Sequence, residues 1–248
     1  MRTAAAATRH LPHMVDLFEE VPARVLAVYA HPDDPDISCG GSLAKWARAG
    51  SEIHVVICAT GDKGSSDPEA LGQDVIERRA SEVHQAAAIL RLTGLHLLGR
   101  PDGEFENDLE LRSELVRLMR THRPEAVVCP DPTAVFFGAH HYNHRDHRTV
   151  GWAVLDAAAP ASGSARYFPE AGPAHSIPLA LLSGSLEANV WVDISTTIDD
   201  KLRAVACHES QLLDANDWYA SALRDGAQHA GRQAGVDYAE AFRRVLLT

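Results

Sequence analysis

The stretch RVLAVYAHPDDPDISCGGSLAKWARAGSEIHVVICA, residues 24–59, contains a strand, a helix and a second strand in that order. Residues 24–30 and 53–59 are short apolar runs rich in β-branched residues, which is typical of buried strands. The segment between them, residues 40–50, has helical composition and ends at a glycine, a common helix stop. This order predicts a βαβ unit, in which two parallel strands are joined through a helix.

The alternation of strands and helices continues through the first 130 residues. Apolar residues recur at helical spacing in residues 73–92 and 107–122, and short apolar runs at 95–98 and 126–129 are interpreted as the third and fourth strands. Alternation of this kind predicts an α/β fold with a mostly parallel sheet that helices cover on both faces.

The C-terminal half has a weaker pattern. The elements expected there are a helix at 149–158, a strand at 189–194, a helix at 197–213 and a helix in the Ala-rich tail. Residues 160–178 are rich in Pro, Gly and Ser, and we expect residues 160–188 to form a rim loop of the active site. Because no internal repeat or clear linker is present, the sequence predicts a single domain over residues 1–248, with residues 1–22 as an N-terminal extension.

The composition of the chain speaks against several classes of function. The formal net charge is −11, and no stripe of Lys and Arg is present, which speaks against nucleic-acid binding. No apolar segment approaches the ~20 residues that a membrane span requires, and the alanines at the start are interrupted by Arg9 and His10, unlike a signal peptide. We therefore expect a cytoplasmic protein with a small-molecule partner, bound to neither nucleic acid nor membrane.

The spacing of the four cysteines bears on disulfide formation and on thiolate metal binding. They lie far apart, without C-x-x-C spacing, at Cys39, Cys58, Cys129 and Cys207. This pattern indicates reduced thiols rather than a disulfide framework or a thiolate zinc site. A zinc ion would therefore be bound by nitrogen and oxygen.

Polar residues stand where the first strand ends. His31, Asp33 and Asp34 come directly after the apolar run, where a packed strand would carry another Val or Ile. A group of histidines follows the fourth strand, at His140, His141, His144 and His147. In a doubly wound sheet, ligands bind outside the carboxyl ends of the strands, at the switch point where the strand order reverses. Both motifs are therefore expected to face one crevice.

Histidines and aspartates that meet in this crevice can form a metal site of N and O ligands with an open position. Those that do not bind metal can act as base and acid. The alternative is that His31 caps a strand and that the histidine group is a solvated loop, because surface His and Asp are ordinary. The convergence of two distant motifs favours the site.

These motifs resemble a known family. His31-Pro-Asp-Asp34 with Cys39-Gly-Gly41, and Asn143-His-Arg-Asp-His-Arg148, are similar to motifs of the LmbE-like/PIG-L family of zinc-dependent N-acetylglucosaminyl deacetylases. The similarity runs through most of the chain and includes a late match at His208-Glu-Ser-Gln211. The resemblance implies a Rossmann-like three-layer α/β/α fold, removal of acetyl groups from N-acetylglucosamine units, and a homo-oligomer.

The resemblance also implies roles for single residues. One zinc ion per subunit would be held by His31, Asp34 and His147, and Fe(II) would suit the same ligands. Asp33 would be the general base. His144 would be the imidazolium that stabilises the oxyanion or protonates the leaving amine, with Asp146 holding it in place.

Substrate contacts are implied by the same resemblance. Arg79 and Asp102 match positions that contact the sugar, and Tyr142 occupies a loop position from which a tyrosine reaches the carbonyl. Taken alone, Arg79 would be a solvated charge or an ion-pair partner, and Asp102 a turn residue. Relatives commonly have Glu and Pro where this chain has Pro35 and Arg145, so the substrate stays open.

The leading hypothesis is a zinc-dependent hydrolase that deacetylates a small N-acetylglucosamine-containing molecule, such as a glycoside, a chitin-derived disaccharide, a thiol precursor or an antibiotic intermediate. The alternative among enzymes is an amidase acting on a mycothiol-type conjugate. The alternative from another class is a non-catalytic sugar- or nucleotide-binding α/β protein, which predicts no stoichiometric metal.

Overall fold

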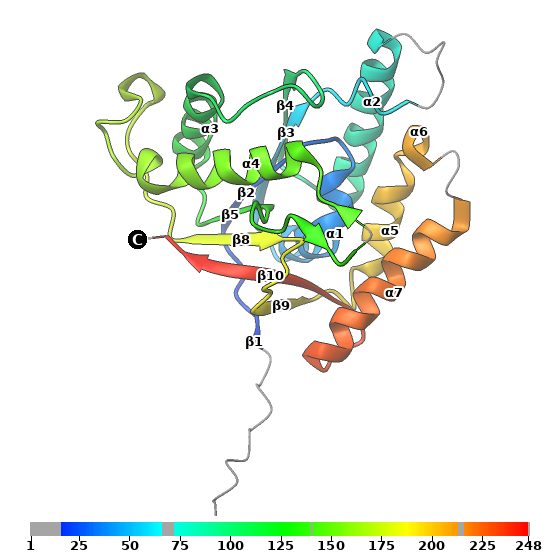
Figure 1. Cartoon of the computed structure of the whole chain (residues 1–248). Coiled ribbons are helices and arrows are strands. Elements are labelled where there is room, and N and C mark those ends of the chain that lie inside the picture. Colours follow the sequence, from blue (N-terminus) through cyan, green and yellow to red (C-terminus); the bar gives the residue numbers. More distant parts are fainter. Residues whose placement is uncertain (1–15, 66–71, 140, 213–215, 248) are drawn as a thin grey trace, which may run out of the picture.

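The computed structural model describes residues 16–65, 72–139, 141–212 and 216–247 (Figure 1). The strands are β1 (Asp16–Leu17), β2 (Arg24–Tyr29), β3 (Glu52–Ala59), β4 (Gly94–Arg100), β5 (Ala126–Pro130), β6 (Phe136–Phe137), β7 (His141–Tyr142), β8 (Leu179–Ser183), β9 (Val190–Asp193) and β10 (Ala239–Leu246). The helices are α1 (Asp34–Arg48), α2 (Gly72–Leu90), α3 (Leu109–His122), α4 (Arg145–Asp156), α5 (Ile198–Ala206), α6 (Glu209–Leu212), α7 (Asn216–Ala234), a π-helical turn η1 (Ala157–Ser162) and a 3-10 turn η2 (Pro169–Ala171).

Eight strands form one sheet in the order β1-β9-β10-β8-β5-β2-β3-β4. All neighbouring pairs are parallel except those of β10, which runs antiparallel to β8 and β9. The predicted α/β class with a mostly parallel sheet is therefore confirmed. The chain passes from β2 through β3 to β4 and then returns to place β5 on the other side of β2, so the switch point lies between β2 and β5, as the sequence predicts.

Helices cover both faces of the sheet, which gives three layers (Figure 1). Alternate residues of β3 point to opposite faces: Val55 and Ile57 join the apolar layer that includes Leu90 of α2, whereas Val56 joins the layer that includes Leu115 of α3. This period of two is the expected behaviour of a strand that is buried on both faces. Among the described residues, none of the helices has the length and apolarity needed to cross a membrane.

Helix α1 begins earlier than the sequence suggests. It starts at Asp34 rather than at Gly40, and its backbone leaves helical geometry at Cys39 (φ −146°). Glu240 of β10 caps the second segment, because its carboxylate accepts hydrogen bonds from the backbone N–H groups of Gly41 (3.0 Å) and Ser42 (2.8 Å). The early start places Asp34 in the first turn of a helix at the switch point.

The expected rim loop, residues 160–188, is wrong in most of its length. Residues 179–183 form β8, a buried strand between β5 and β10. The preceding segment is tied to the end of α3, where Arg120 donates to the carbonyl oxygens of Ala161, Ser162, Ser164, Tyr167, Phe168 and Gly172. This end of α3 leads into the start of β5. The segment therefore lies at the amino ends of the parallel strands, on the side of the molecule away from their carboxyl ends.

The expected N-terminal extension is also shorter than residues 1–22. Residues 16–17 form β1, which pairs with β9, and Phe18 is buried. The sheet therefore begins at Asp16. Residues 1–15, in which a signal peptide was considered, lie outside the described residues, as does His140.

Candidate metal centre and its surroundings

His31 and Asp34 lie together at the carboxyl end of β2. The backbone N–H of His31 donates to Asp34 Oδ2 (2.8 Å), and His31 Nδ1 lies 3.3 Å from the same oxygen. Each side chain is only 12% exposed. The tight turn between β2 and α1 thus holds both groups at the switch point.

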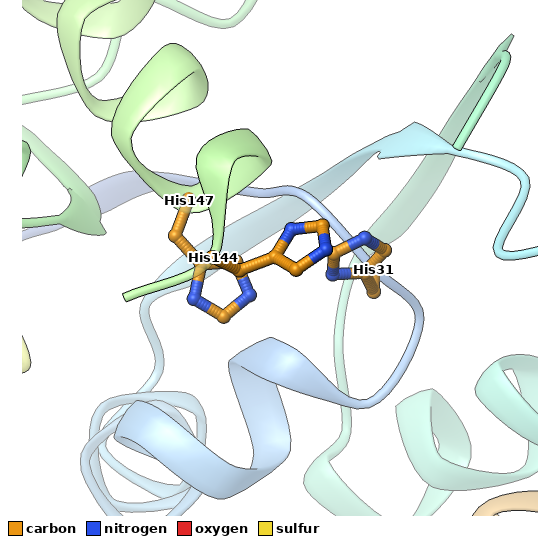
Figure 2. Close-up of side chains that lie close together, drawn as sticks. All are labelled: His31, His144 and His147. Carbon is orange, nitrogen blue, oxygen red and sulfur yellow. The ribbon is translucent and has the colours of Figure 1, made fainter. Parts of the chain in front are cut away.

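The second motif reaches the same place from α4. His144 stands at the N-cap of this helix, and His147 lies in its first turn. Figure 2 shows the rings of His31, His144 and His147 gathered at the point where α4 approaches the end of β2, and their nitrogens lie within 4.8 Å of one another. The predicted convergence of two motifs more than a hundred residues apart is therefore present in the structure.

Asp34 lies between two histidines, with one carboxylate oxygen near each ring. Its Oδ2 is 3.3 Å from His31 Nδ1, and its Oδ1 is 3.1 Å from His147 Nε2. Two ligand atoms on a tetrahedral zinc, at bond lengths of about 2.0–2.1 Å, lie about 3.3 Å apart. The donor set of two imidazoles and one carboxylate suits Zn²⁺ and also Fe(II).

Two further carboxylates support the His31 ring. Asp102 Oδ1 lies 3.1 Å from His31 Nε2, and Asp146 Oδ2 lies 3.7 Å from the same nitrogen. A carboxylate behind a histidine fixes the orientation of the ring and raises its strength as a ligand. Asp102, which was expected to contact a sugar, has one carboxylate oxygen on His31 and also lines a cavity beside the centre.

The carboxylates make this region favourable for a cation. Burial lowers the pKa of His31, but hydrogen bonds to three carboxylates outweigh burial and raise this pKa to about 12. The carboxylates belong to Asp102, Asp146 and Asp34. Such a site favours a positive charge at the His31 ring. Either a proton or a divalent metal ion bound to the ring can provide this charge.

Asp33, adjacent to Asp34, points elsewhere. Its Oδ1 lies 3.3 Å from Nη2 of Arg79, which also donates through Nη1 to the carbonyl of Gly61 (2.8 Å). Arg79 is only 3% exposed, so it is a buried ion-pair partner of Asp33 rather than a solvated charge. The two adjacent carboxylates therefore have different partners, as the sequence hypothesis requires.

His144 is held differently from the prediction. The backbone N–H of Asp146 donates to His144 Nδ1 (3.2 Å), whereas the Asp146 carboxylate accepts from the N–H of Gly103 (2.7 Å). Burial and the neighbouring His31 lower the pKa of His144. A ring whose Nδ1 accepts a hydrogen bond carries its proton on Nε2 when neutral, so this contact leaves Nε2 of His144 to face the centre as a donor.

Tyr142 does not reach the centre. It is 57% exposed, and its ring stacks against Phe136 and Arg148. Neighbouring residues on a strand point to opposite sides, and it is His141 that faces the cavity beside Asp34. The expected contact of Tyr142 with a substrate carbonyl is therefore not supported.

Two cavities meet at Asp34. One, of about 320 Å³, is lined by His147 together with Tyr29, Ile37, Ser38, Pro130, Phe137, His141, Asn143, Ser183 and Gly184. The other, of about 360 Å³, is lined by His31, Asp33, Lys63, Gly64, Arg79, Asp102, Gly103, His144 and Gln211. The centre therefore has room on two sides, with charged residues concentrated on the second.

Several cavity residues were missed by sequence reasoning. His141 and Asn143 stand in the histidine-rich stretch and could have been proposed from their position. Ser183 gave no signal, because β8 was not predicted. The side chain of His208, whose role the sequence left open, binds the carboxylate of Asp36 in a buried contact of 2.6 Å. Arg145 forms an ion pair with Glu106.

Comparison with known proteins agrees with this geometry. The family described as PIG-L, GlcNAc-PI de-N-acetylase, matches residues 26–158. This chain belongs to the PIG-L family. A diacetylchitobiose deacetylase of Thermococcus kodakarensis is 34% identical over 227 residues, which cover 90% of this chain and 83% of the relative.

Two further PIG-L comparisons point to the same group of enzymes. A 1D-myo-inositol 2-acetamido-2-deoxy-alpha-D-glucopyranoside deacetylase of Saccharopolyspora erythraea is 27% identical, with 81% of this chain and 88% of the relative covered. The solved N,N'-diacetylchitobiose deacetylase of Pyrococcus horikoshii superposes with a TM-score of 0.82 at 28% identity, over 90% of this chain and 84% of that chain. The predicted membership of the PIG-L family is confirmed.

Proposed function

We propose that this chain is a metal-dependent N-deacetylase that removes the acetyl group from an N-acetylglucosamine unit of a small molecule. The observation that carries the proposal is the position of Asp34 between His31 and His147, with Asp33 directed away toward Arg79. The PIG-L relatives named above, which deacetylate N-acetylglucosamine derivatives by name, support the substrate class. An amidase specific for larger mycothiol-type conjugates is not favoured by these relatives.

The proposed metal is zinc, one ion per subunit, held by His31, Asp34 and His147. When bound, zinc lowers the pKa of a coordinated water to roughly 7 and polarises the amide carbonyl. Asp102 and Asp146 keep the His31 ring in place through its Nε2. Fe(II) remains an alternative occupant of the same ligands.

Asp33 is proposed as the general base. Its carboxylate lines the larger cavity and stands next to a metal ligand without being one, so it can accept a proton from the attacking water. Arg79 orients this carboxylate through the 3.3 Å contact to Oδ1. A base held by a buried guanidinium presents a fixed direction to the water.

His144 is proposed to stabilise the charge that develops on the amide oxygen. Its neutral ring donates through Nε2, because Nδ1 is occupied by the backbone N–H of Asp146. A preorganised donor at the oxyanion stabilises the transition state more than the ground state. The proton that Asp33 has taken from water is then available for the departing amine.

The test is turnover of three N-acetylated compounds by the zinc-loaded protein: N,N'-diacetylchitobiose, an N-acetylglucosaminyl inositol, and a mycothiol-type conjugate. Mass spectrometry should detect loss of one acetyl group, 42 Da, from at least one of the first two. Cleavage of the conjugate alone would support the amidase, and no cleavage of any compound would contradict the proposal.

Finer features of the enzyme are also proposed. Reduced thiols at all four cysteines fit a cytoplasmic location.

Exposed aromatic side chains at Phe136 and Tyr142, beside the cavity mouth, fit a homo-oligomer that covers them. Light scattering on the purified protein tests the oligomer, and a mass of about 27 kDa would contradict it.

A further inference from the structure

A second group of histidines lies away from the candidate metal centre. His54 of β3, His96 of β4 and His122 at the end of α3 have ligand nitrogens within 4.8 Å of one another. His54 and His96 are each the third residue of their strands, so the group lies near the edge of the sheet opposite the carboxyl ends. We call these three residues the histidine triad.

The triad spans three elements that meet on one face. In the β3–β4 register His54 stands opposite Gly94, and His96 stands opposite Val56, so both histidines point to the face that α3 covers. The ring of His122 stacks on that of His54 with centroids 3.7 Å apart. A ligand bound at the triad would therefore connect α3 to two strands.

The hydrogen bonds of His54 direct a lone pair into the triad. Its Nε2 lies 3.1 Å from Glu52 Oε1, an acceptor, so Nε2 carries the proton. Nδ1 then carries the lone pair, and it accepts a hydrogen bond from His96 Nε2 at 3.2 Å; a metal ion bound by both nitrogens would replace this hydrogen bond. A carboxylate behind a histidine whose other nitrogen faces further histidines is the arrangement found around protein-bound zinc.

The space for this ring exists because Gly94 has no side chain. A Cβ at Gly94 would lie 2.4 Å from His54 Nδ1 and 2.8 Å from Cε1, distances at which atoms overlap. The triad is also only partly exposed, with His54 at 9%. These features distinguish it from histidines scattered on a solvated surface.

We propose that the histidine triad is a second metal site, which binds Zn²⁺ or a similar transition-metal ion through His54 Nδ1, His96 Nε2 and a nitrogen of His122. The 3.2 Å between the first two nitrogens is close to the roughly 3.3 Å expected of two ligands on one tetrahedral zinc. Imidazole donors suit Zn²⁺, Cu²⁺ and Ni²⁺ rather than Mg²⁺ or Ca²⁺. The site leaves a position open to water, and its role is to fasten α3 to the sheet.

The surroundings of His96 and His122 favour the neutral form of both rings. Burial, with His54 close by, lowers the pKa of both His96 and His122. Neutral imidazoles bind metal, whereas protonated ones do not. These two rings are therefore favoured in the neutral form that binds metal.

The experiment is a calorimetric titration of the metal-free full chain with ZnCl₂, performed on the wild type, His96→Asn, His122→Asn and the control His84→Asn. His84 is exposed on α2 and lies outside both sites. The wild type and the control should bind one more equivalent of zinc than either triad variant. This difference does not depend on whether the deacetylase centre binds zinc, so it is independent of the proposed function.

Nitrogen-15 NMR of the histidine side chains gives a second readout in the same samples. Zinc should shift the ring nitrogens of His54, His96 and His122 in the wild type, and the remaining triad rings should no longer shift in the variants. Equal zinc stoichiometry in all four proteins, or a wild type whose triad resonances do not move, would overturn the proposal. Circular dichroism identifies any variant that fails to fold, and the other triad variant then decides.

Discussion

At the level of single residues, the adjacent carboxylates of Asp33 and Asp34 illustrate what the sequence can and cannot predict. The pattern after the first strand identifies both as candidates. Their different roles depend on α1 beginning at Asp34, which turns one carboxylate toward His31 and His147 and the other toward Arg79. Sequence reasoning could assign these roles only through the family resemblance, because side-chain direction follows from the backbone.

The two aspartates should respond differently to the same substitution. Asp33→Asn should retain zinc but lower kcat by about 10²–10⁴, because a general base is removed. Asp34→Asn should lose the zinc of the centre, since a neutral amide replaces the ligand between two histidines. Metal analysis together with kinetics checks both, and zinc loss from Asp33→Asn would reverse the assignment.

His144 tests the ligand set. Its ring lies as close to His31 as that of His147 does, with centroids at 4.9 Å and 5.4 Å, so proximity alone would allow it to bind metal. The proposal predicts that His144→Asn retains one equivalent of zinc at the centre and loses activity. His147→Asn, the matched control, should lose that equivalent. Loss of zinc from His144→Asn would place it among the ligands.

At the level of elements, the missed strands show how packing overrides local composition. The helix expected in the Ala-rich tail is present as α7, but no strand was predicted after it, because residues 239–246 carry Ala, Glu and Arg, which favour helices. The segment becomes β10 because β8 and β9 pair with it on both sides. No signal within eight residues reports strand partners that lie 46 to 67 residues away in the sequence, so this part of the fold could not be predicted locally.

The end of α3 gives a stability prediction. Arg120 is 4% exposed, and within the described part of the chain its guanidinium donates only to backbone carbonyls of residues 161–172. Arg120→Met should lower the free energy of unfolding by about 3 kcal/mol, because the carbonyls lose a charged donor. Urea unfolding measures this, with Arg117→Met as control, because the Arg117 side chain lies on the same helix and is 61% exposed. Equal midpoints for the two variants would contradict the role of Arg120.

The histidine triad at the same end of α3 gives a pH prediction for the metal-free chain. His54, His96, His122 and the carboxylate of Glu52 face one another there. The pKa values of His96 and His122 lie below the ordinary 6.5, so the unfolded state binds more protons, and stability falls as the pH falls below 6.5. His122→Gln should lose less stability than the wild type between about pH 7.5 and about pH 5.5. An identical loss in urea unfolding would contradict this.

At the level of the whole molecule, the sheet topology creates the centre. The β2–β5 switch point joins residues 31–34 to residues 144–147, and this was the part of the fold that the sequence predicted best. The alternation of strands and helices sufficed for the parallel half. The antiparallel β10, the position of residues 160–178 and the contacts of Asp102 and Tyr142 required the three-dimensional structure.

The most direct test of the central claim is acetate release from N,N'-diacetylchitobiose by one preparation in three states: as purified, after chelation and dialysis, and after zinc is returned in enough quantity to fill both proposed sites. We expect the purified protein to release acetate, the chelated protein to release none, and the protein with zinc returned to release acetate again. Asp34→Asn should not regain this activity when zinc is returned. Undiminished release from the metal-free protein, or full recovery in Asp34→Asn, would contradict a metal-dependent deacetylase built on His31, Asp34 and His147.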